Sequence, residues 1–369
     1  MDVVIVGGGM VGAACAYYCG QAGLAVTVVE RGSVAAGTTG AGEGNILVSD
    51  KEPGPELDLA LLSARLWRDL AAEHGPDFEY EAKGGLVVAA DEHELTALLA
   101  LAAKQSDCGV VTEQVEPADV EPNIAPGLAG GVFYPQDAQV QPMLTAAHLL
   151  RLAAERFGAT ILTDTTLLGF TETGVRTTAG ELTADHVVNA AGTWGGEIAD
   201  LAGAPVPILP RRGFVLVTEP LPALVRHKVY AADYVADVAS DTEGLRTSPV
   251  VEGTRSGTIL IGASRERVGF DRTPSLPVLR SLAAGAIRLF PILADVSAIR
   301  AYAGFRPYCP DHLPVIGIDP RRPGLLHACG HEGAGIGLAP ATGSLIAQLI
   351  TGKAPTLDVT PFRPDRFAA

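Results

Sequence analysis

The stretch DVVIVGGGMVGAACAYY near the start of the chain restricts the fold more than any other feature. Residues 2–6 are mostly apolar and predict a buried strand, and the periodicity that follows predicts a helix over 10–20. Gly23 ends this helix before a second predicted strand at 25–29, which leads to Glu30. Between the first strand and the helix the glycines have the spacing G-x-G-x-x-G, at Gly7, Gly9 and Gly12.

A strand, a turn of this spacing, a helix and a strand that ends in an acidic residue form the arrangement that binds dinucleotides. The first glycine permits the tight turn, the second lets a pyrophosphate approach the backbone, and the third lets helix and strand pack closely. The helix start at Met10 and Val11 supplies N–H groups for the phosphates. Glu30 is expected to accept hydrogen bonds from the ribose hydroxyls, and its charge disfavours NADP. The motif alone does not separate NAD from FAD.

A long loop of small residues, RGSVAAGTTGAGEGN, follows Glu30. Such a loop suits an extended dinucleotide that passes under backbone amides, although a surface loop stays open as the alternative on these residues alone. The residues expected to contact the cofactor here are Arg31, Thr38, Thr39, Gly42, Glu43, Gly44 and Asn45.

A second glycine-rich turn, CGHEGAGIGLAPATG, lies near the other end of the sequence. It follows an apolar segment, GLLHACG, that predicts a strand, and it opens the predicted last helix of the chain. On its own it is equally typical of a packing turn before a buried helix. Two such turns at opposite ends of one chain need an explanation.

Composition limits the function classes. A chain of 369 residues predicts two domains or one interleaved pair, and a hydrophobic fraction of 47% supports a large core. The net charge of −15 argues against nucleic-acid binding. The cysteines number five and show no CxxC pair or zinc spacing, so we expect no metal site and no disulfide framework, as in the reducing cytoplasm.

The remaining pattern predicts a mixed α/β fold. Amphipathic helices are expected over 56–75, ending at Gly75, and over 142–157, ending at Gly158. Short strands and turns alternate over 159–195, and strands are expected in RRGFVLVTEP and GTILIGASRERVGF. Met1 leads straight into a strand, so no signal peptide is expected, and no uninterrupted apolar run predicts a membrane span.

Together these motifs resemble the family of FAD enzymes that includes D-amino-acid oxidase, glycine oxidase and sarcosine oxidase. The resemblance rests on the first glycine turn with Glu30, on GTTGAGEGN, and on DHVVNAAGTWG, GFRPYCPDHLPVIG and CGHEGAGIGLAP. These motifs span essentially the whole chain. Within the family, AGEGNILVSDKEPGPELDLALLS and CGHEGAGIGLAPATG are most similar to the FAD subunits of D-hydroxyproline dehydrogenase, opine oxidase and hydrogen cyanide synthase.

The resemblance implies a Rossmann-like FAD-binding domain interleaved with a mainly antiparallel β-sheet domain for the substrate. We expect the FAD-binding domain to comprise residues 1–80, 141–210 and 304–369. The substrate domain then comprises residues 81–140 and 211–303.

The resemblance also implies where the bound cofactor lies. The turn after the strand HVVN brings Ala190, Ala191 and Gly192 to the dinucleotide, with Trp194 beside them as a packing residue. The second glycine turn meets the isoalloxazine ring, and its helix N-terminus faces the N1–C2=O edge, where reduced flavin is negative. The contacts expected in this part are Gly304, Arg306, Gly330, His331, Glu332, Gly333, Ala334, Gly335, Ile336 and Gly337.

The implied reaction is the oxidation of a small amino or imino acid by hydride transfer from its α-carbon to flavin N5, which yields an imine. Arg306 in GFRP is the expected anchor for the substrate carboxylate, and His331 is the second expected catalytic residue. The substrate candidates are D-hydroxyproline, proline, glycine and sarcosine.

Several points stay open at this stage. Glu43, Tyr230, Tyr234, His227 and Arg212 are candidates to face the substrate. The position of Cys309 does not match a flavin-attaching cysteine, so FAD is expected to bind non-covalently. Electrons go either to oxygen or to partner subunits of a hetero-oligomer, and a homo-oligomer is equally open. The alternative function is an FAD-bearing electron-transfer or assembly subunit with little activity alone.

Overall fold

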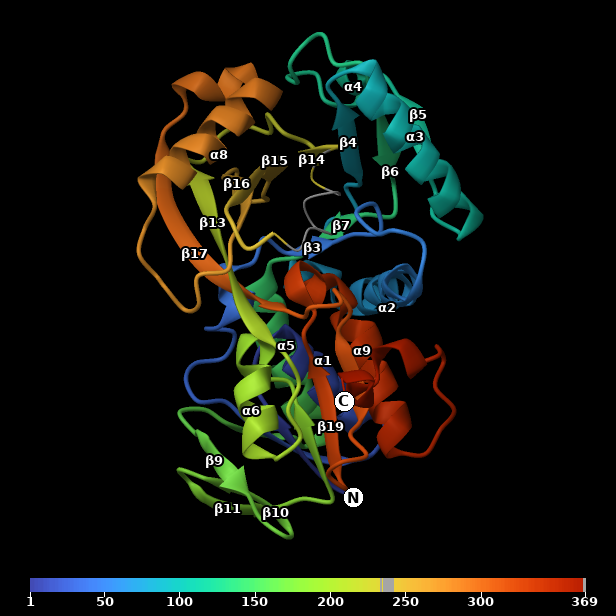
Figure 1. Cartoon of the computed structure of the whole chain (residues 1–369), viewed down its shortest axis with the longest axis vertical. Coiled ribbons are helices and arrows are strands. Elements are labelled where there is room, and N and C mark those ends of the chain that lie inside the picture. The colour runs from blue at the N-terminus through green and yellow to red at the C-terminus, as the bar shows by residue number, and fades with distance from the viewer. Residues whose placement is uncertain (233, 235–241, 368–369) are drawn as a thin grey trace.

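A computed structural model describes residues 1–232, 234 and 242–367 of the chain. Figure 1 shows two parts stacked along the long axis, each built around its own sheet. The lower part carries both marked termini, and strands of distant segments meet in it. The mixed α/β class predicted from the sequence is confirmed.

The first sheet has six strands in the order β18-β19-β12-β1-β2-β8. All neighbouring pairs in it are parallel except β18 with β19. Because side chains alternate along a strand, Val3 and Ile5 of β1 pack on one face while Val4 and Val6 pack on the other. The strands span Asp2–Val6 (β1), Ala25–Val29 (β2), Thr160–Leu162 (β8), His186–Asn189 (β12), Val315–Ile318 (β18) and Leu325–Cys329 (β19).

Helices cover the first face of this sheet and pack on one another, α1 on α5 and α9, and α2 on α9. They span Met10–Gln21 (α1), Pro55–Phe78 (α2), Pro142–Phe157 (α5) and Gly335–Ile350 (α9). The other face packs on α6 and a small three-stranded sheet. These span Gly195–Leu201 (α6), Leu167–Phe170 (β9), Gly174–Thr177 (β10) and Gly180–Thr183 (β11).

The second sheet has eight strands in the order β17-β13-β16-β15-β14-β4-β6-β5, and every neighbouring pair is antiparallel except β14 with β4. Its strands span Gly85–Ala89 (β4), Glu113–Val115 (β5), Gly130–Tyr134 (β6), Leu209–Thr218 (β13), Lys228–Ala231 (β14), Arg246–Gly253 (β15), Ile259–Arg265 (β16) and Ala298–Tyr308 (β17). The helices beside it span Glu92–Asp107 (α3), Pro117–Val120 (α4) and Leu276–Leu289 (α8). A two-stranded ribbon of Asn45–Ile46 (β3) and Ala138–Gln139 (β7) lies between the two parts (Figure 1).

The two sheets draw their strands from alternating parts of the chain, which supports the interleaved division that we propose for the two domains. Strand β17 runs without a break through the proposed boundary between residues 303 and 304. It pairs along its length with β13, so one long hairpin-like pair connects the substrate sheet to the cofactor side.

One predicted helix end is wrong. Helix α2 continues past Gly75, through Pro76, to Phe78, and ends where Glu79 adopts a left-handed conformation with φ of 51°. The buried Phe78 ring packs edge-on against Trp67 at 6.2 Å between centroids, and this burial outweighs the hydrogen bond lost at the proline. Helix α5 begins at Pro142 and ends before the left-handed Gly158 as predicted.

Among the described residues, one helical segment, Glu332–Ile350, is long and apolar enough to cross a membrane. However, 67% of its apolar window is buried inside the protein, against α1 and α2. A helix that is apolar all round is typical of a protein core as well as of a membrane span, so this segment is weak evidence for the latter.

Candidate functional site

A cavity of about 380 Å³ opens where the carboxyl ends of β19, β12 and β1 meet the second sheet. In open parallel sheets this edge is where ligands bind. The strand order places the turn after β12 between the two glycine turns, so three loops from distant parts of the sequence line one cavity.

The first glycine turn contributes bare backbone to this cavity. Gly7 has φ of +115°, a conformation that favours glycine, and a Cβ on Gly12 would overlap the carbonyl oxygen of Gly7. Gly9 caps α1 without any side-chain hydrogen bond, and Gly9, Met10 and Val11 line the cavity. Gly12 is also a predicted cofactor contact. It lies outside the cavity lining, and its lack of a side chain lets the helix pack closely on the turn.

Glu30 lies at the end of β2 and lines the same end of the cavity. Its Oε2 accepts a hydrogen bond from the Gly8 amide at 2.7 Å, and its Oε1 accepts one from Gly32 at 2.9 Å. These bonds fix the carboxylate beside the turn. Each carboxylate oxygen has a further lone pair, so Glu30 can accept hydrogen bonds from a ligand as well.

The turn after β12 connects the first loop to the second sheet. The hydroxyls of Thr38 and Thr193 lie 2.9 Å apart, and each lies within hydrogen-bond distance of the carbonyl oxygen of Phe305 on β17, at 2.8 and 2.6 Å. Since each hydroxyl has one proton, two of these three contacts are hydrogen bonds at any one time. Trp194 stacks on Phe270 with an interplanar angle of 6° and carries the guanidinium of Arg31 at 3.9 Å from its ring centre. Trp194 also lines the cavity, so it is placed to contact a bound ligand as well as to pack.

In the second glycine turn, five of the predicted residues line the cavity: His331, Glu332, Gly333, Gly335 and Ile336. Helix α9 begins there with Ala334 as its N-cap and no side-chain cap, so its first amides face this space. At the other end of the cavity, the first amide of α1, Met10 N–H, donates to Thr39 Oγ1 at 2.9 Å. A helix N-terminus therefore lies at each end of the cavity, and that of α9 has no side-chain cap.

Three other predicted contacts of this turn lie outside the cavity lining. Gly330 has φ of +75°, and a Cβ there would lie 2.7 Å from Ile208, so glycine is needed for the turn and the packing. Gly337 packs on the backbone of residues 45–47, and its carbonyl oxygen accepts a hydrogen bond from Trp67 Nε1 at 3.0 Å. Ala334 serves as the helix cap.

The charges of this turn are compensated within the protein. Glu332 forms ion pairs with Arg211 on β13 and with His312, the latter at 3.1 Å. Burial raises the pKa of Glu332, but the hydrogen bond from His312 and the charge of Arg211 outweigh it, so the pKa is lowered. Burial lowers the pKa of His331 to about 3, and its Nε2 lies 2.9 Å from the hydroxyl of Thr342. His331 is therefore neutral at ordinary pH.

Arg306 reaches the cavity from β17. Its guanidinium passes over Gly213, where any Cβ would overlap it, and donates to the carbonyl oxygen of Ser264 at 2.8 Å. Gly333 of the second turn lies beside it, since a Cβ there would be 3.5 Å from Arg306 Nε. Burial and the nearby charge of Arg265 lower the pKa of Arg306. The arrangement puts a half-buried cation next to the start of α9.

This geometry can be compared with known proteins. A family model described as FAD dependent oxidoreductase (DAO) matches residues 2–349. The chain belongs to the DAO family of FAD-dependent oxidoreductases. FAD is its cofactor, which decides between the two dinucleotides that the first motif left open.

Relatives match over nearly the whole chain. The chain is 30% identical to hydrogen cyanide synthase subunit HcnC of Pseudomonas protegens, over 100% of this chain and 96% of that protein. It is 32% identical to glycine oxidase of Pseudomonas aeruginosa, over 98% of each. The crystal structure of glycine oxidase from Geobacillus kaustophilus matches with a TM-score of 0.89 and 28% identity, over 99% of this chain and 98% of that one.

The residues of this DAO-family protein fit FAD. One continuous cavity joins the N-termini of α1 and α9, which suit the anionic groups of a dinucleotide, and it carries a fixed carboxylate at the end of β2. The other predicted contacts also line it: Thr39, Gly42, Glu43, Gly44, Asn45, Ala190, Ala191, Gly192 and Gly304. Cys309 is buried against Val315 and Cys329, outside the lining.

Sequence reasoning missed part of the wall. Residues 165–167, which follow β8, line the cavity next to Glu30, because β8 is the parallel neighbour of β2. Residues Glu197, Ile198 and Leu201 of α6 also line it, as do Phe305 and Pro307. Strand β8 has only three residues and is followed by polar residues, so the sequence does not show that it pairs with β2.

Of the candidates for facing the substrate, Tyr234 and Glu43 line the cavity. The Tyr230 hydroxyl instead donates to Ser49 at 2.5 Å, inside the core. His227 is paired with Glu121 at 2.9 Å, and Arg212 is paired with Glu266 and Asp271. These three residues therefore serve the fold of the substrate sheet.

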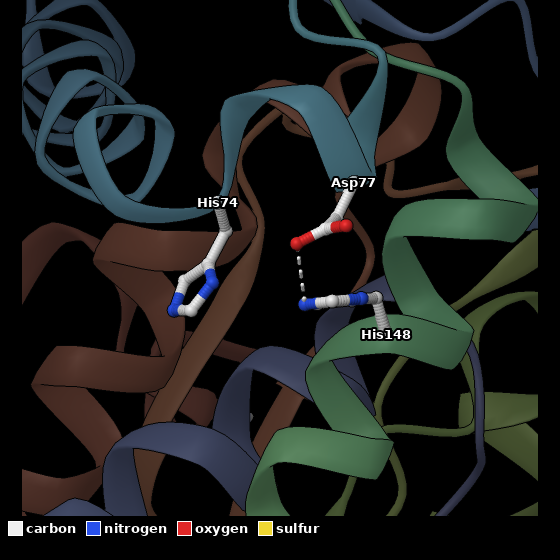
Figure 2. A group of neighbouring side chains, drawn as sticks. All are labelled: His74, Asp77 and His148. Carbon is white, nitrogen blue, oxygen red and sulfur yellow. Dashed lines mark ion pairs between the residues drawn. The ribbon is translucent and has the colours of Figure 1, made fainter.

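A separate group of side chains lies outside the cavity lining. Figure 2 shows His74 and Asp77 of α2 facing His148 of α5, and Nε2 of His148 lies 3.6 Å from Asp77 Oδ2. One ligand atom of each lies within 4.8 Å of the others, an arrangement that the sequence could not show because two helices supply it. The guanidinium of Arg151 lies 3.1 Å from Nδ1 of His148, and this positive charge opposes a bound cation.

Proposed function

We propose that this protein oxidises a small amino or imino acid at its Cα–N bond. The observation that carries the proposal is the half-buried guanidinium of Arg306 in the cavity, next to the N-terminus of α9. A guanidinium presents a fork of donors that matches a carboxylate, and a carboxylate held there places the adjacent α-carbon in the cavity. FAD, when bound, supplies the two-electron acceptor.

The protein's own residues mainly bind and orient the substrate. Arg306 holds the carboxylate, the α-hydrogen leaves with both bonding electrons, the amine proton passes to solvent, and the product is an imine that water hydrolyses. His331, our second candidate for a catalytic residue, contributes a neutral ring to the cavity wall. We therefore expect the orientation of the substrate by Arg306 to contribute more to the rate than acid–base catalysis by His331.

The test is a substrate panel with the FAD-loaded protein. D-hydroxyproline, proline, sarcosine and glycine are each offered with an artificial dye and with oxygen as acceptor. Losing a buried partner of a carboxylate costs about 2–5 kcal/mol. Arg306→Ala should therefore reduce kcat/KM by between about tenfold and a thousandfold while FAD content stays normal. Turnover within about twofold of wild type would remove Arg306 from this role.

Arg300→Ala is the matched control, because Arg300 is an exposed arginine of the same strand. Its kinetics should equal those of wild type. A fall in kcat/KM in both variants would show that changes in the strand, and not the loss of a carboxylate contact, reduce the activity.

A second candidate function is an FAD-bearing subunit that passes electrons to partner chains. It is supported by the similarity to a protein named as a subunit of hydrogen cyanide synthase. This candidate predicts faster turnover with dye than with oxygen and low activity of the isolated chain. Faster turnover with oxygen would contradict it.

A further inference from the structure

Arg265, the last residue of β16, is a buried cation that has no counter-charge among the residues that the structure describes. Its relative exposure is 4%, and its guanidinium lies over the ring of Tyr234, 4.9 Å from the centroid. Within the described parts of the chain it has no hydrogen bond and no ion pair. Its neighbours on the sheet differ, because Arg211 pairs with Glu332, and Arg212 pairs with Glu266.

A buried charge without a partner is costly, so proteins pair such groups or use them to bind ions of opposite charge. The Tyr234 ring stabilises the guanidinium through its π face but supplies no negative charge and no hydrogen-bond acceptor to it. The missing partner of Arg265 is therefore an anion.

Arg265 lies directly behind the cavity wall, next to residues that line it, and is not itself part of the lining. Arg306 donates to the carbonyl oxygen of Ser264, the residue directly before Arg265. Tyr234, which carries the Arg265 guanidinium on its ring, lines the cavity together with Arg306. The two arginines are close enough that the charge of Arg265 contributes to the lowered pKa of Arg306.

We propose that Arg265 binds a second carboxylate of the substrate, while Arg306 binds the first. The substrate class is then an amino or imino dicarboxylic acid. The second carboxylate is carried either on a nitrogen substituent or on the side chain. Glu43 and Glu332 already act on the charge of Arg306, so the second carboxylate compensates the charge of Arg265. This inference rests on the proposed function and narrows its substrate class.

The test uses pairs of compounds that differ in one carboxylate. Iminodiacetate and sarcosine differ by the second carboxylate on nitrogen, and glutamate and glutamine, each as both enantiomers, differ by the charge on the side chain. We expect kcat/KM for one dicarboxylate to exceed that of its partner by at least about tenfold, the scale of one buried charge pair. The pair that shows the preference identifies where the second carboxylate lies.

Arg265→Met should lower the ratio of kcat/KM within that pair by about tenfold or more, and Arg265→Lys should retain part of it. Arg300→Met, the exposed arginine in the same sheet, should leave the ratio unchanged. Binding is read separately from the visible spectrum of the bound flavin, in titrations with succinate and with propionate. Succinate should bind more tightly to wild type, and Arg265→Met should remove the difference.

The outcomes separate this inference from the proposed function. Turnover of sarcosine or glutamine without any preference for a dicarboxylate overturns the inference and leaves amino acid oxidation standing. An equal loss for both members of a pair in Arg265→Met shows a structural role and also overturns it. If no amino acid is oxidised with either acceptor, the proposed function fails. In that case, equal binding of succinate and propionate overturns the second anion site as well, whereas tighter succinate binding that Arg265→Met abolishes supports it.

Discussion

The two glycine turns, the first at Val6–Gly12 and the second at Cys329–Gly337, have the same construction and different surroundings. Each follows a parallel strand and opens a helix whose N-cap residue makes no side-chain hydrogen bond. The helices they open, α1 and α9, pack against each other. The protein thus presents two helix N-termini to one ligand from the same side of one sheet.

The surroundings show the different tasks. The first turn is backbone alone, fixed by the Glu30 carboxylate through the Gly8 and Gly32 amides. The second turn carries charged side chains that pair with the substrate sheet, since Glu332 binds Arg211. A phosphate needs only amides, whereas the ring end of a flavin has to be held in a fixed relation to the substrate. We propose that the second turn holds the ring end and that the pairing of Glu332 with the second sheet provides that relation.

The largest expected difference between the turns comes from one substitution made in both. In Gly12→Ala the new Cβ overlaps the backbone of Gly7, which cannot move aside without opening the turn. We expect a loss of about 1–3 kcal/mol in the free energy of unfolding and weak FAD retention. In Gly335→Ala the nearest atom is His331 Cβ at 3.4 Å and φ is −57°, so the protein should fold and hold FAD normally.

Urea unfolding and the flavin absorbance after gel filtration measure both effects. If the two variants have equal free energies of unfolding, the close contact between Gly12 and Gly7 does not explain why the first turn has glycine at residue 12.

A smaller effect is expected from the carboxylate of the first turn. Glu30→Ala removes the acceptor for the Gly8 and Gly32 amides and for the ribose, so FAD affinity should fall by up to about 2 kcal/mol, the scale of a charge-assisted hydrogen bond. Glu30→Gln keeps the shape and one acceptor oxygen and should lose less. Unchanged FAD affinity in Glu30→Ala would contradict the ribose assignment.

The electrostatics of the second turn can be tested with sulfite, which forms an anionic adduct with the bound flavin. An N-terminus of α9 that faces the ring favours this charge by about 1–2 kcal/mol. Gly335→Asp places a negative charge there and should weaken sulfite binding roughly tenfold while FAD remains bound. Gly335→Ala serves as the control for bulk. Equal sulfite affinity in the aspartate variant would show that this turn does not lie at the negative edge of the ring.

Local backbone requirements were predictable from the sequence, and contacts between distant segments were not. The first turn was found because Gly7 and Gly12 are demanded by conformation and close packing. The true end of α2 at Phe78 depends on burial against Trp67, which no local pattern shows. The environment of Arg265 was not predictable for the same reason, since it depends on the placement of β16 between β13 and β15.

The smallest expected effect concerns His331 of the second turn. Its pKa of about 3 lies below the ordinary value near 6.5, so the folded protein keeps the ring neutral while the unfolded chain protonates it as the pH falls. This residue therefore destabilises the fold as the pH falls below about 6.5 and has no pH-dependent effect above it. His331→Gln keeps a hydrogen-bonding group next to Thr342 and removes the titration. Between pH 6 and 5 the free energy of unfolding should fall by about 1 kcal/mol less in the variant than in wild type. The pH profile of kcat/KM between pH 7 and 9 should keep its shape, since the ring is neutral throughout. Parallel stability curves for both proteins, measured in urea, would show that His331 titrates normally and that the second turn does not hold it in a dry environment.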